Sequence, residues 1–289
     1  MGRRLLSIIV PHYNSPHTLR KLLDSIPEID DIEVIVIDDK SNMFVDELHE
    51  IINDSKYSHV VFLQNVTKNK GPGACRNIGL SYAKGEWILF ADADDYFLEG
   101  FYGKVTKYFS SNYDVVFFMP TSVYLKNGKR ATRHLPYEKL IKKYLKGAKY
   151  SEVRLRYRFR SPCSKLMRKE FLDKNDIRFD NIIVCEDDMF SVKIGYHMEK
   201  FTATSEIIYC ITEHETSLSN KKGDEYFQSY LSAILMVDRF LRSKLGWKEY
   251  RQVTTPAMKI VYRAFYNRIS IKELITVLGT VFRYRIPLI

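Results

Sequence analysis

Short apolar runs alternate with amphipathic stretches along the first hundred residues of the chain. Four of these runs are rich in β-branched and aromatic residues and lie at 5–10, 33–37, 60–64 and 86–91. Runs of this length and composition are typical of strands that are covered on both faces of a sheet. The hydrophobic pattern therefore predicts four buried strands in the first third of the chain.

Helical patterns fill the intervals between these runs. Ser15 can cap a helix that has Pro16 at its first position, and a second helix is expected over about 43–52. A third begins at Pro72 and is expected to end at Gly85, where glycine can adopt the left-handed conformation. Strands that alternate with helices predict an α/β fold, with a Rossmann-like, mainly parallel sheet flanked by helices.

The last part of the chain has a different pattern. Residues 208–220 read as a strand followed by a polar loop, and apolar residues then recur at helical spacing over 224–289. We therefore predict one α/β unit over 1–219 and a C-terminal helical appendage over 220–289.

Polar residues follow three of the four predicted strands, at 11–14, 38–41 and 92–95. Because parallel strands place their carboxyl ends at one edge of a sheet, these segments should lie together, where ligands bind in such folds. Turn formation explains any one Asp-Asp pair, but three coincident cases favour a ligand site. Asp92 and Asp94, one residue apart after a strand, can hold a hard divalent cation that also binds diphosphate oxygens.

Several familiar ligand motifs are missing. The glycine cluster at 71–73 has Arg76 where a dinucleotide fingerprint needs its third glycine, and no GxxxxGK[ST] loop occurs. An EF-hand loop is excluded because Tyr96 and Phe97 occupy the positions of a ligand and of the obligatory glycine.

Charge is concentrated in one region. The chain carries +10, but residues 126–174 hold 17 Lys/Arg against 4 Asp/Glu, a local balance of +13. This region is either a solvated surface or a patch that meets phosphate on a lipid headgroup, an anionic polymer or a nucleic acid.

Cysteine spacing and the start of the chain bear on its compartment. The four cysteines lie far apart without a CxxC pair, so neither a zinc site nor a disulfide framework is indicated, and a reducing compartment fits. The first apolar run has six residues, too few for a signal peptide or a membrane span. We expect an unprocessed cytoplasmic chain.

Five stretches in a fixed order carry a family resemblance: SIIVPHYN, EVIVIDDKS, NKGPGACRNIGLSYAKGEWILFADADD, SPCSKL and CEDDMF. Over residues 5–219 the chain resembles the inverting family-2 glycosyltransferases of the GT-A fold, which use nucleotide-sugar donors. The resemblance implies a nucleotide-binding half at 1–95 and an acceptor-binding half at 96–219. It does not indicate which sugar is moved.

The resemblance also implies a donor site. Its residues are Pro11, Tyr13, Asn14, Asp39, Arg76, Asp92, Ala93, Asp94 and Lys165. Asp92 and Asp94 would form the DxD signature, with Asp92 toward the ribose and Asp94 toward Mn²⁺ or Mg²⁺. Tyr13 and Asp39 would hold uracil, since a ring offers a flat face and a carboxylate accepts a hydrogen bond from the imide N–H, which favours UDP over ADP.

Two of these residues, and His214 further along the chain, have simpler alternatives. Arg76 lies in the first turns of a helix whose amides can face an anion, but a surface ion pair is equally consistent with the sequence. Lys165 either approaches the diphosphate or the acceptor, or is an ordinary surface lysine. His214 is either a third metal or phosphate ligand or a solvated histidine.

The second acidic cluster, at 185–188, is the catalytic candidate. Inversion requires a base that takes the proton of the acceptor hydroxyl, and the resemblance assigns this role to Asp187. Glu186 would orient the acceptor, and Asp188 is the substitute if the alignment is shifted by one residue. The same acids also suit a helix N-terminus, and both roles can hold at once.

These observations predict a metal-dependent inverting glycosyltransferase that moves a sugar from a UDP-sugar to a glycan or lipid-linked glycan in surface polysaccharide synthesis. The alternatives are a GDP- or dTDP-sugar donor, or a non-catalytic basic module that binds an anionic polymer. No nucleic-acid-binding motif is present. The basic, aromatic C-terminal helices suit core packing, a second subunit, or peripheral contact with an anionic membrane at its inner face.

Overall fold

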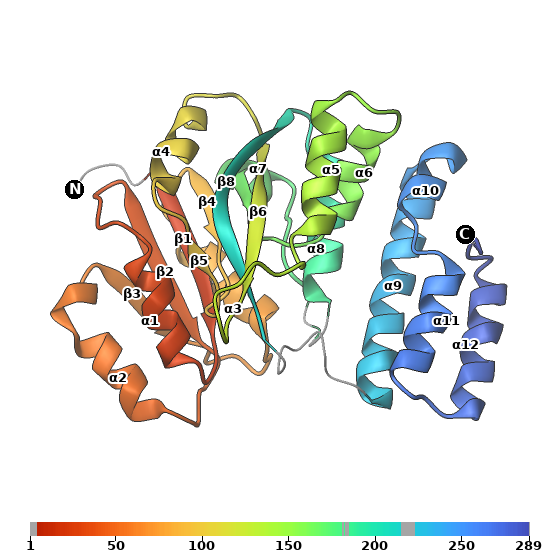
Figure 1. Cartoon of the computed structure of the whole chain (residues 1–289), viewed down its shortest axis with the longest axis horizontal. Helices are drawn as coiled ribbons and strands as arrows, with labels where there is room; N and C mark the ends of the chain where they lie inside the picture. Colours follow the sequence, from red (N-terminus) through yellow and green to blue (C-terminus); the bar gives the residue numbers. More distant parts are fainter. Residues whose placement is uncertain (1–4, 181, 183–184, 215–222, 289) are drawn as a thin grey trace.

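The structure is a computed structural model that describes residues 5–180, 182, 185–214 and 223–288. Within these residues the centre of the molecule is an eight-stranded sheet of order β3-β2-β1-β4-β7-β6-β8-β5 (Figure 1). The strands are β1 (Leu6–His12), β2 (Ile32–Asp38), β3 (Val60–Gln64), β4 (Trp87–Phe90), β5 (Tyr96–Phe97), β6 (Val115–Tyr124), β7 (Lys165–Arg168) and β8 (Phe201–Glu213). The helices before the C-terminal region are α1 (Pro16–Asp24), α2 (Val45–Asn53), α3 (Pro72–Tyr82), α4 (Phe101–Val105), α5 (Leu135–Leu145), α6 (Ser151–Arg158), α7 (Lys169–Lys174) and α8 (Glu186–His197), with short 3₁₀ turns η1 (Ser55–Tyr57) and η2 (Thr106–Tyr108).

The four strands predicted from the apolar runs are parallel neighbours. β1 pairs with β2 from Leu6 opposite Ile32 to His12 opposite Asp38, and it pairs with β4 on its other side. β3 extends the sheet beyond β2. This register brings the carboxyl ends of β1, β2 and β4 to one edge, so the polar segments that follow them are neighbours, as predicted.

The other half of the sheet is mixed. β7 runs antiparallel to both of its neighbours, β4 and β6, whereas β6 and β8 are parallel to each other. β5 is a two-residue strand antiparallel to β8. The α/β class and the mainly parallel, Rossmann-like sheet are confirmed, with β7 and β5 as its antiparallel members.

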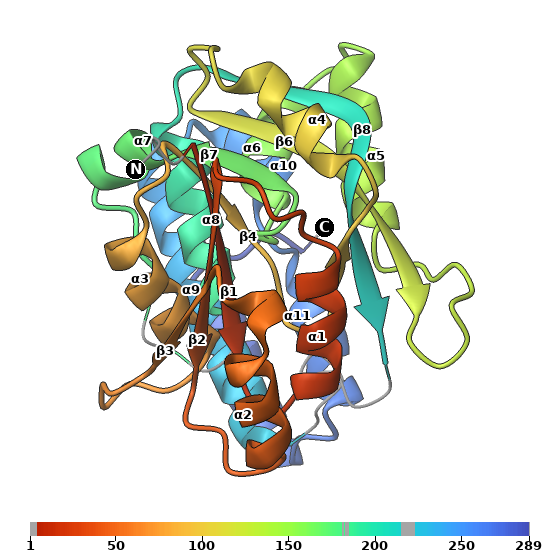
Figure 2. The same ribbon diagram turned by 90° about the vertical axis from the view of Figure 1, so that its left-hand side faces the viewer.

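Helices cover both faces of this sheet. α3 and α8 lie on one side of β1 to β3, and α1 and α2 lie on the other (Figure 2). α3 approaches β1 closely because of Gly79, where an added Cβ would lie 2.3 Å from Cγ2 of Ile9. The predicted end of α3 at Gly85 is wrong, since the helix ends at Tyr82. Gly85 instead packs on β1, where its Cβ would lie 2.6 Å from the backbone nitrogen of Ser7.

The C-terminal region is helical, as predicted. It consists of α9 (Asp224–Lys244), α10 (Trp247–Val253), α11 (Ala257–Tyr266) and α12 (Ile271–Arg283), which share a small apolar core of their own. A second cluster joins it to the sheet unit, because Tyr157 of α6 and Met189 of α8 pack with Val237, Leu241 and Tyr250. The predicted boundary between 219 and 220 lies outside the described residues. None of the helices in the described ranges combines the length and apolar character needed to cross a bilayer.

Candidate active site

Asn14 holds together the loops that follow β1 and β2. Its backbone lies in the left-handed region, at φ 51°, and its Oδ1 accepts hydrogen bonds from the amides of Asn42 (2.9 Å) and Met43 (3.0 Å). Its own amide donates to Oγ of Ser41 at 2.8 Å. The neighbouring Tyr13 keeps 54% of its surface exposed, so its ring is accessible to a flat ligand.

Asp39 anchors the loop that leads into α3. One carboxylate oxygen accepts a hydrogen bond from the amide of Gly71, and the other accepts one from Nδ2 of Asn65, both at 2.7 Å. Gly71 has φ 104° and immediately precedes α3, so the position suits glycine. Each carboxylate oxygen can accept a further bond, which leaves Asp39 able to bind a ligand N–H. Asn65 is fully buried, and sequence reasoning missed it because the apolar Val66 follows it, so no run of polar residues marks the end of β3.

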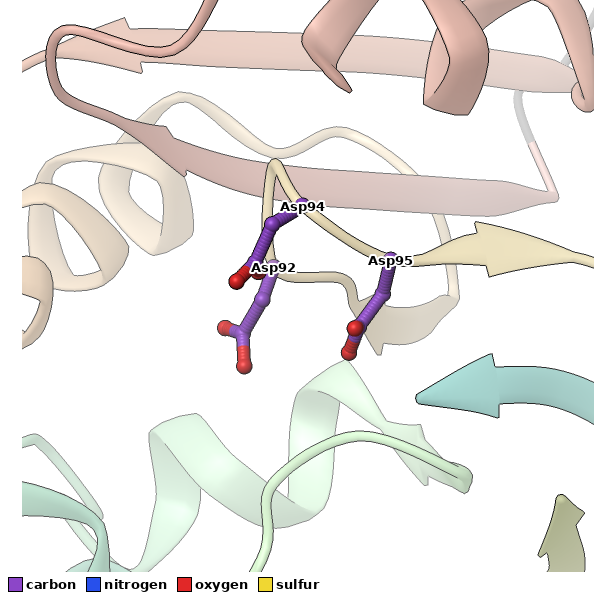
Figure 3. Close-up of side chains that lie close together, drawn as sticks. All are labelled: Asp92, Asp94 and Asp95. Carbon is purple, nitrogen blue, oxygen red and sulfur yellow. The ribbon is translucent and has the colours of Figure 1, made fainter. Parts of the chain in front are cut away.

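Three carboxylates converge just beyond the end of β4. Asp92, Asp94 and Asp95 each offer an oxygen, and these atoms lie within 4.8 Å of one another (Figure 3). Sequence reasoning assigned Asp92 and Asp94 but not Asp95. Asp95 is buried, and its Oδ1 accepts a hydrogen bond from the amide of Thr212 in β8 at 2.6 Å. Ala93, buried between the first two acids, contributes no side-chain polar group.

Crowding makes this acidic cluster electrostatically unfavourable without a counter-charge. Burial and the nearby carboxylate of Asp92 raise the pKa of Asp94, while His214 lowers it. Burial and Asp94 raise the pKa of Asp95 well above its usual range. Nε2 of His214 lies 2.8 Å from Oδ2 of Asp94. Oxygen ligands at this spacing fit a hard divalent cation, whose charge would relieve the repulsion.

Arg76 joins this cluster to the second acidic segment. Its Nη2 donates to Oδ1 of Asp92 at 2.6 Å and its Nη1 donates to Oε1 of Glu186 at 2.8 Å. The guanidinium is buried and lies 5.2 Å from the centre of the Phe179 ring. Burial alone would lower the pKa of Arg76, but the charges of Asp92 and Glu186 outweigh this effect and raise the pKa above its usual range. The guanidinium group therefore remains charged. The surface ion pair that the sequence left open for Arg76 is wrong.

The acids of the second cluster form the first turn of α8. Cys185 precedes the helix in the left-handed region at φ 62°, and Glu186, Asp187 and Asp188 follow it. Burial raises the pKa of Asp187 to about 8, and the charges of Glu186 and Asp188 add to this shift while Arg76 opposes it. A carboxyl group with such a pKa is suited to exchange a proton near neutral pH. The helix N-terminus suggested by the sequence is confirmed, and the acidic group lies on it.

Lys165 lies in the protein interior, at the start of β7. Only 1% of its surface is exposed, so the surface-lysine alternative is wrong. Its Nζ donates to the carbonyl of Phe159 at 2.7 Å and to Oγ of Ser191 at 3.0 Å. Burial lowers the pKa of Lys165 to about 7, and the carboxylate of Asp187 opposes this shift more than any other charge does. Ser191 is four residues after Asp187 on α8, so the ammonium lies about one helical turn below that carboxylate.

Basic groups approach the same end of α8 from two directions. Nη1 of Arg160 lies 3.6 Å from Oδ1 of Asp188. Lys259 of α11 lies close to Arg158, Arg160 and Asp188. Burial, Arg158 and Arg160 lower the pKa of Lys259, and Asp188 opposes this shift. Sequence reasoning did not connect α11 to the acidic segment, because 70 intervening residues hide that proximity.

A family comparison decides the class of the chain. The model of Glycosyl transferase family 2 matches residues 7–175, more than half of the chain. The chain belongs to glycosyl transferase family 2. Among family-2 relatives, a poly(ribitol-phosphate) beta-glucosyltransferase of Bacillus spizizenii is 42% identical over 98 residues, which is 32% of this chain and 15% of that protein. The poly(ribitol-phosphate) beta-N-acetylglucosaminyltransferase TarS of Staphylococcus aureus is 28% identical over 235 residues, 78% of this chain and 37% of TarS.

A solved family-2 structure confirms the predicted GT-A fold. The crystal structure of S. aureus TarS 1–349 in complex with UDP-GlcNAc matches with a TM-score of 0.73, over 97% of this chain and 81% of that one, at 23% identity. This chain spans well under half the length of the two full-length relatives. The chain is thus a member of glycosyl transferase family 2 that is similar to proteins named for poly(ribitol-phosphate).

Proposed function

We propose that this chain transfers a sugar from a UDP-sugar to a hydroxyl group of a glycan or lipid-linked glycan, with inversion and with help from Mn²⁺ or Mg²⁺. The observation that carries the proposal is Arg76, which binds Asp92 and Glu186 on one guanidinium. A donor cluster at the end of β4 and a candidate base on α8 thereby become one site. This is the arrangement that direct transfer between two substrates needs.

The nucleotide is proposed to lie over the loops after β1 and β2. The exposed ring of Tyr13 can stack on uracil, Asp39 can accept its imide hydrogen, and Pro11 and Asn14 shape the same edge. The TarS structure, which has the same fold, is a complex with UDP-GlcNAc. A GDP- or dTDP-sugar is the alternative. UDP release from a panel of nucleotide sugars, with poly(ribitol-phosphate) as acceptor, separates these donors and should favour UDP.

Asp94, Asp92 and His214 are the proposed ligands of the cation. Asp95, whose carboxylate lies in the same cluster, would add negative charge beside them. A bound divalent ion would neutralise the diphosphate as it leaves the sugar. Asp92 is also held by Arg76, so its carboxylate is oriented before a donor arrives. Titrating UDP with and without manganese tests this assignment. Tighter binding with manganese, lost in the Asp94→Asn variant, is expected.

Asp187 is the proposed base. It takes the proton of the acceptor hydroxyl while that oxygen attacks the anomeric carbon from the face opposite UDP, and the bond to the diphosphate oxygen breaks. Glu186, fixed by Arg76, would orient the acceptor, and Asp188 is the substitute base. Because Asp187 must be ionised and its pKa is raised to about 8, the transfer rate should rise with pH toward that value.

The acceptor is proposed to carry phosphate. Arg160 and Lys259 lie beside Asp188, next to the proposed base, and Arg158 lies near both of these cations. Two relatives are named for poly(ribitol-phosphate), a polyanion. Lys165 does not belong to this group, because its ammonium is bonded inside the protein; a contact with donor or acceptor stays a prediction that its burial disfavours.

Peripheral membrane contact is part of the proposal, since a lipid-linked acceptor requires access to a bilayer. α12 exposes Ile275, Leu278 and Phe282 along one side, and Lys272 and Arg283 flank them. Apolar and basic side chains in this arrangement suit an anionic bilayer surface on the cytoplasmic side. Co-sedimentation with phosphatidylglycerol vesicles, compared with a Phe282→Ser variant, tests this contact; a homo-oligomer would show instead as a concentration-dependent mass.

The rival function is a basic binding module without catalysis. It would bind an anionic polymer through the region 126–174 and would show neither manganese-enhanced UDP binding nor UDP release. The enzyme is expected to show both. Polymer binding that persists without any effect of UDP or manganese would favour the module.

A further inference from the structure

Four arginines line one hollow in the C-terminal helical region. Arg239 and Arg242 come from the end of α9, and Arg283 and Arg285 come from the end of α12 and the residues after it. The hollow has a volume of about 390 Å³ and also touches Tyr284 and Ser243. Volumes of this order hold small ligands in proteins.

One carboxylate in this hollow, that of Asp238, offsets the charge of only one of these four arginines. Asp238 is the acidic residue in its lining, but its buried carboxylate already accepts hydrogen bonds from the hydroxyls of Tyr250 (2.5 Å) and Thr254 (2.9 Å) and from Nη2 of Arg242 (3.0 Å). Among the described residues, the guanidinium groups of Arg283 and Arg285 make no hydrogen bond or ion pair. Two forked cationic groups thus remain available to a ligand.

The hollow is also built in advance. Nη2 of Arg242 lies 3.4 Å from the carbonyl oxygen of Arg285, which fixes the end of α12 against α9. Arg285 itself has φ 49°, a left-handed conformation that turns the chain after α12. Cations at helix C-termini offset the helix dipole. That effect explains basic residues at each end separately, but it does not require four of them around one cavity.

We infer that this hollow binds a phosphate group. Arginine matches phosphate through two parallel hydrogen bonds, and a cavity lined by four arginines and one carboxylate, with two of the guanidinium groups unpaired, selects an anion. The site is separate from the proposed catalytic edge. Tyr230 of α9 lies near Cys185 and Asp188, whereas Arg239 and Arg242 follow it by 9 and 12 residues, roughly 14–18 Å along the helix. The phosphate can belong to a polyol-phosphate polymer or to a lipid headgroup.

The test compares two double variants of the full chain. Arg283→Gln with Arg285→Gln removes the two free forks. Arg251→Gln with Arg268→Gln removes the same charge from the same region, and Arg268, at φ 55°, matches the backbone of Arg285. Inorganic phosphate is titrated into each protein by calorimetry at low salt. Circular dichroism checks that each variant is folded.

The wild-type protein and the 251/268 variant should bind phosphate alike, and the 283/285 variant should bind it at least tenfold more weakly. Equal weakening in both variants, or no binding by the wild type, overturns the inference. Should the 283/285 variant fail to fold, Arg239→Gln replaces it, with the same loss expected. Repeating the comparison with poly(ribitol-phosphate) and with phosphatidylglycerol vesicles identifies the source, which is the probe whose binding depends on residues 283 and 285.

Discussion

The donor side and the acceptor side of the proposed site are built in different ways. On the donor side, Asn14, Asp39 and Asp92 occupy the ends of three neighbouring parallel strands, so the backbone alone brings them together. On the acceptor side, Asp187 and Lys165 belong to a helix and a short antiparallel strand, and long side chains connect them to the rest. The donor side is therefore a property of the sheet, whereas the acceptor side depends on individual buried contacts.

Buried charge is the second difference. Arg76, Glu186 and Lys165 are all buried, and each satisfies its charge through specific partners. Removing one partner from such a group leaves the other uncompensated, which costs more than the pair itself contributes. Substitutions on the acceptor side should thus affect both stability and proton transfer, while those at exposed donor residues should affect binding alone.

The Asp187→Asn variant should give the largest effect. Loss of the base should lower the transfer rate by roughly 10²–10⁴-fold, while UDP binding stays near the wild-type value. UDP release and calorimetry measure the two quantities. Asp188→Asn is the matched control; if it abolishes transfer and Asp187→Asn does not, the base must be reassigned to Asp188.

The Arg76→Met variant breaks the connection between the two sides. It leaves Asp92 and the buried Glu186 without their cation, so the free energy of unfolding should fall by about 3–5 kcal/mol. Denaturant unfolding measures this loss. The control is Arg178→Met, whose pair with Asp173 is partly exposed and should contribute less than about 1 kcal/mol. Equal losses in both variants would contradict the bridging role of Arg76.

The Lys165→Met variant should change pH dependence more than folding. Without the ammonium, ionised Asp187 loses a favourable charge, so the rise of the transfer rate with pH should move upward by about one unit. Burial lowers the pKa of Lys165 from 10.5 to about 7, so the unfolded chain takes up this proton at a higher pH than the folded protein does. The free energy of unfolding should therefore fall as pH drops from about 10.5 to about 7 and level off below that, and the advantage of methionine should grow over the same range. A pH–rate profile and unfolding at two pH values measure both effects.

Two controls separate charge from hydrogen bonding in this comparison. Ser191→Ala keeps the ammonium of Lys165 but removes one of its hydrogen-bond acceptors. Lys193→Met removes another lysine of α8, whose Nζ lies 3.5 Å from Oδ1 of Asp180. Neither should move the profile. A shift of the same size in Lys193→Met would attribute the effect to net charge alone.

The Tyr13→Ala variant should give the smallest effect. Its ring is exposed and makes one long contact, a 3.5 Å hydrogen bond from its hydroxyl to Asn42, so folding should be unaffected. UDP affinity should fall by about 1 kcal/mol through lost stacking, and Tyr13→Phe should restore it. Unchanged UDP affinity in Tyr13→Ala would show that uracil does not stack on this ring.

The sequence predicts the donor side better than the acceptor side for a physical reason. Apolar periodicity identifies strands, and the parallel arrangement then places residues 11–14, 38–41 and 92–95 at one edge. No comparable rule brings Arg76 to Glu186, which is 110 residues away, or buries Lys165. Such contacts depend on packing between segments with no shared periodicity. The predicted end of α3 at Gly85 is wrong because this glycine allows the chain to pack closely on β1 and does not cap the helix.

The two ion pairs of Arg76 have a consequence for kinetics. A donor and its cation that bind to Asp92 would change the ion pair at Nη2 of Arg76, while Nη1 still holds Glu186 beside the proposed acceptor site. We therefore expect compulsory order in the catalytic cycle, with the nucleotide sugar entering before its co-substrate and UDP leaving last. Product inhibition by UDP should accordingly be competitive with the donor alone.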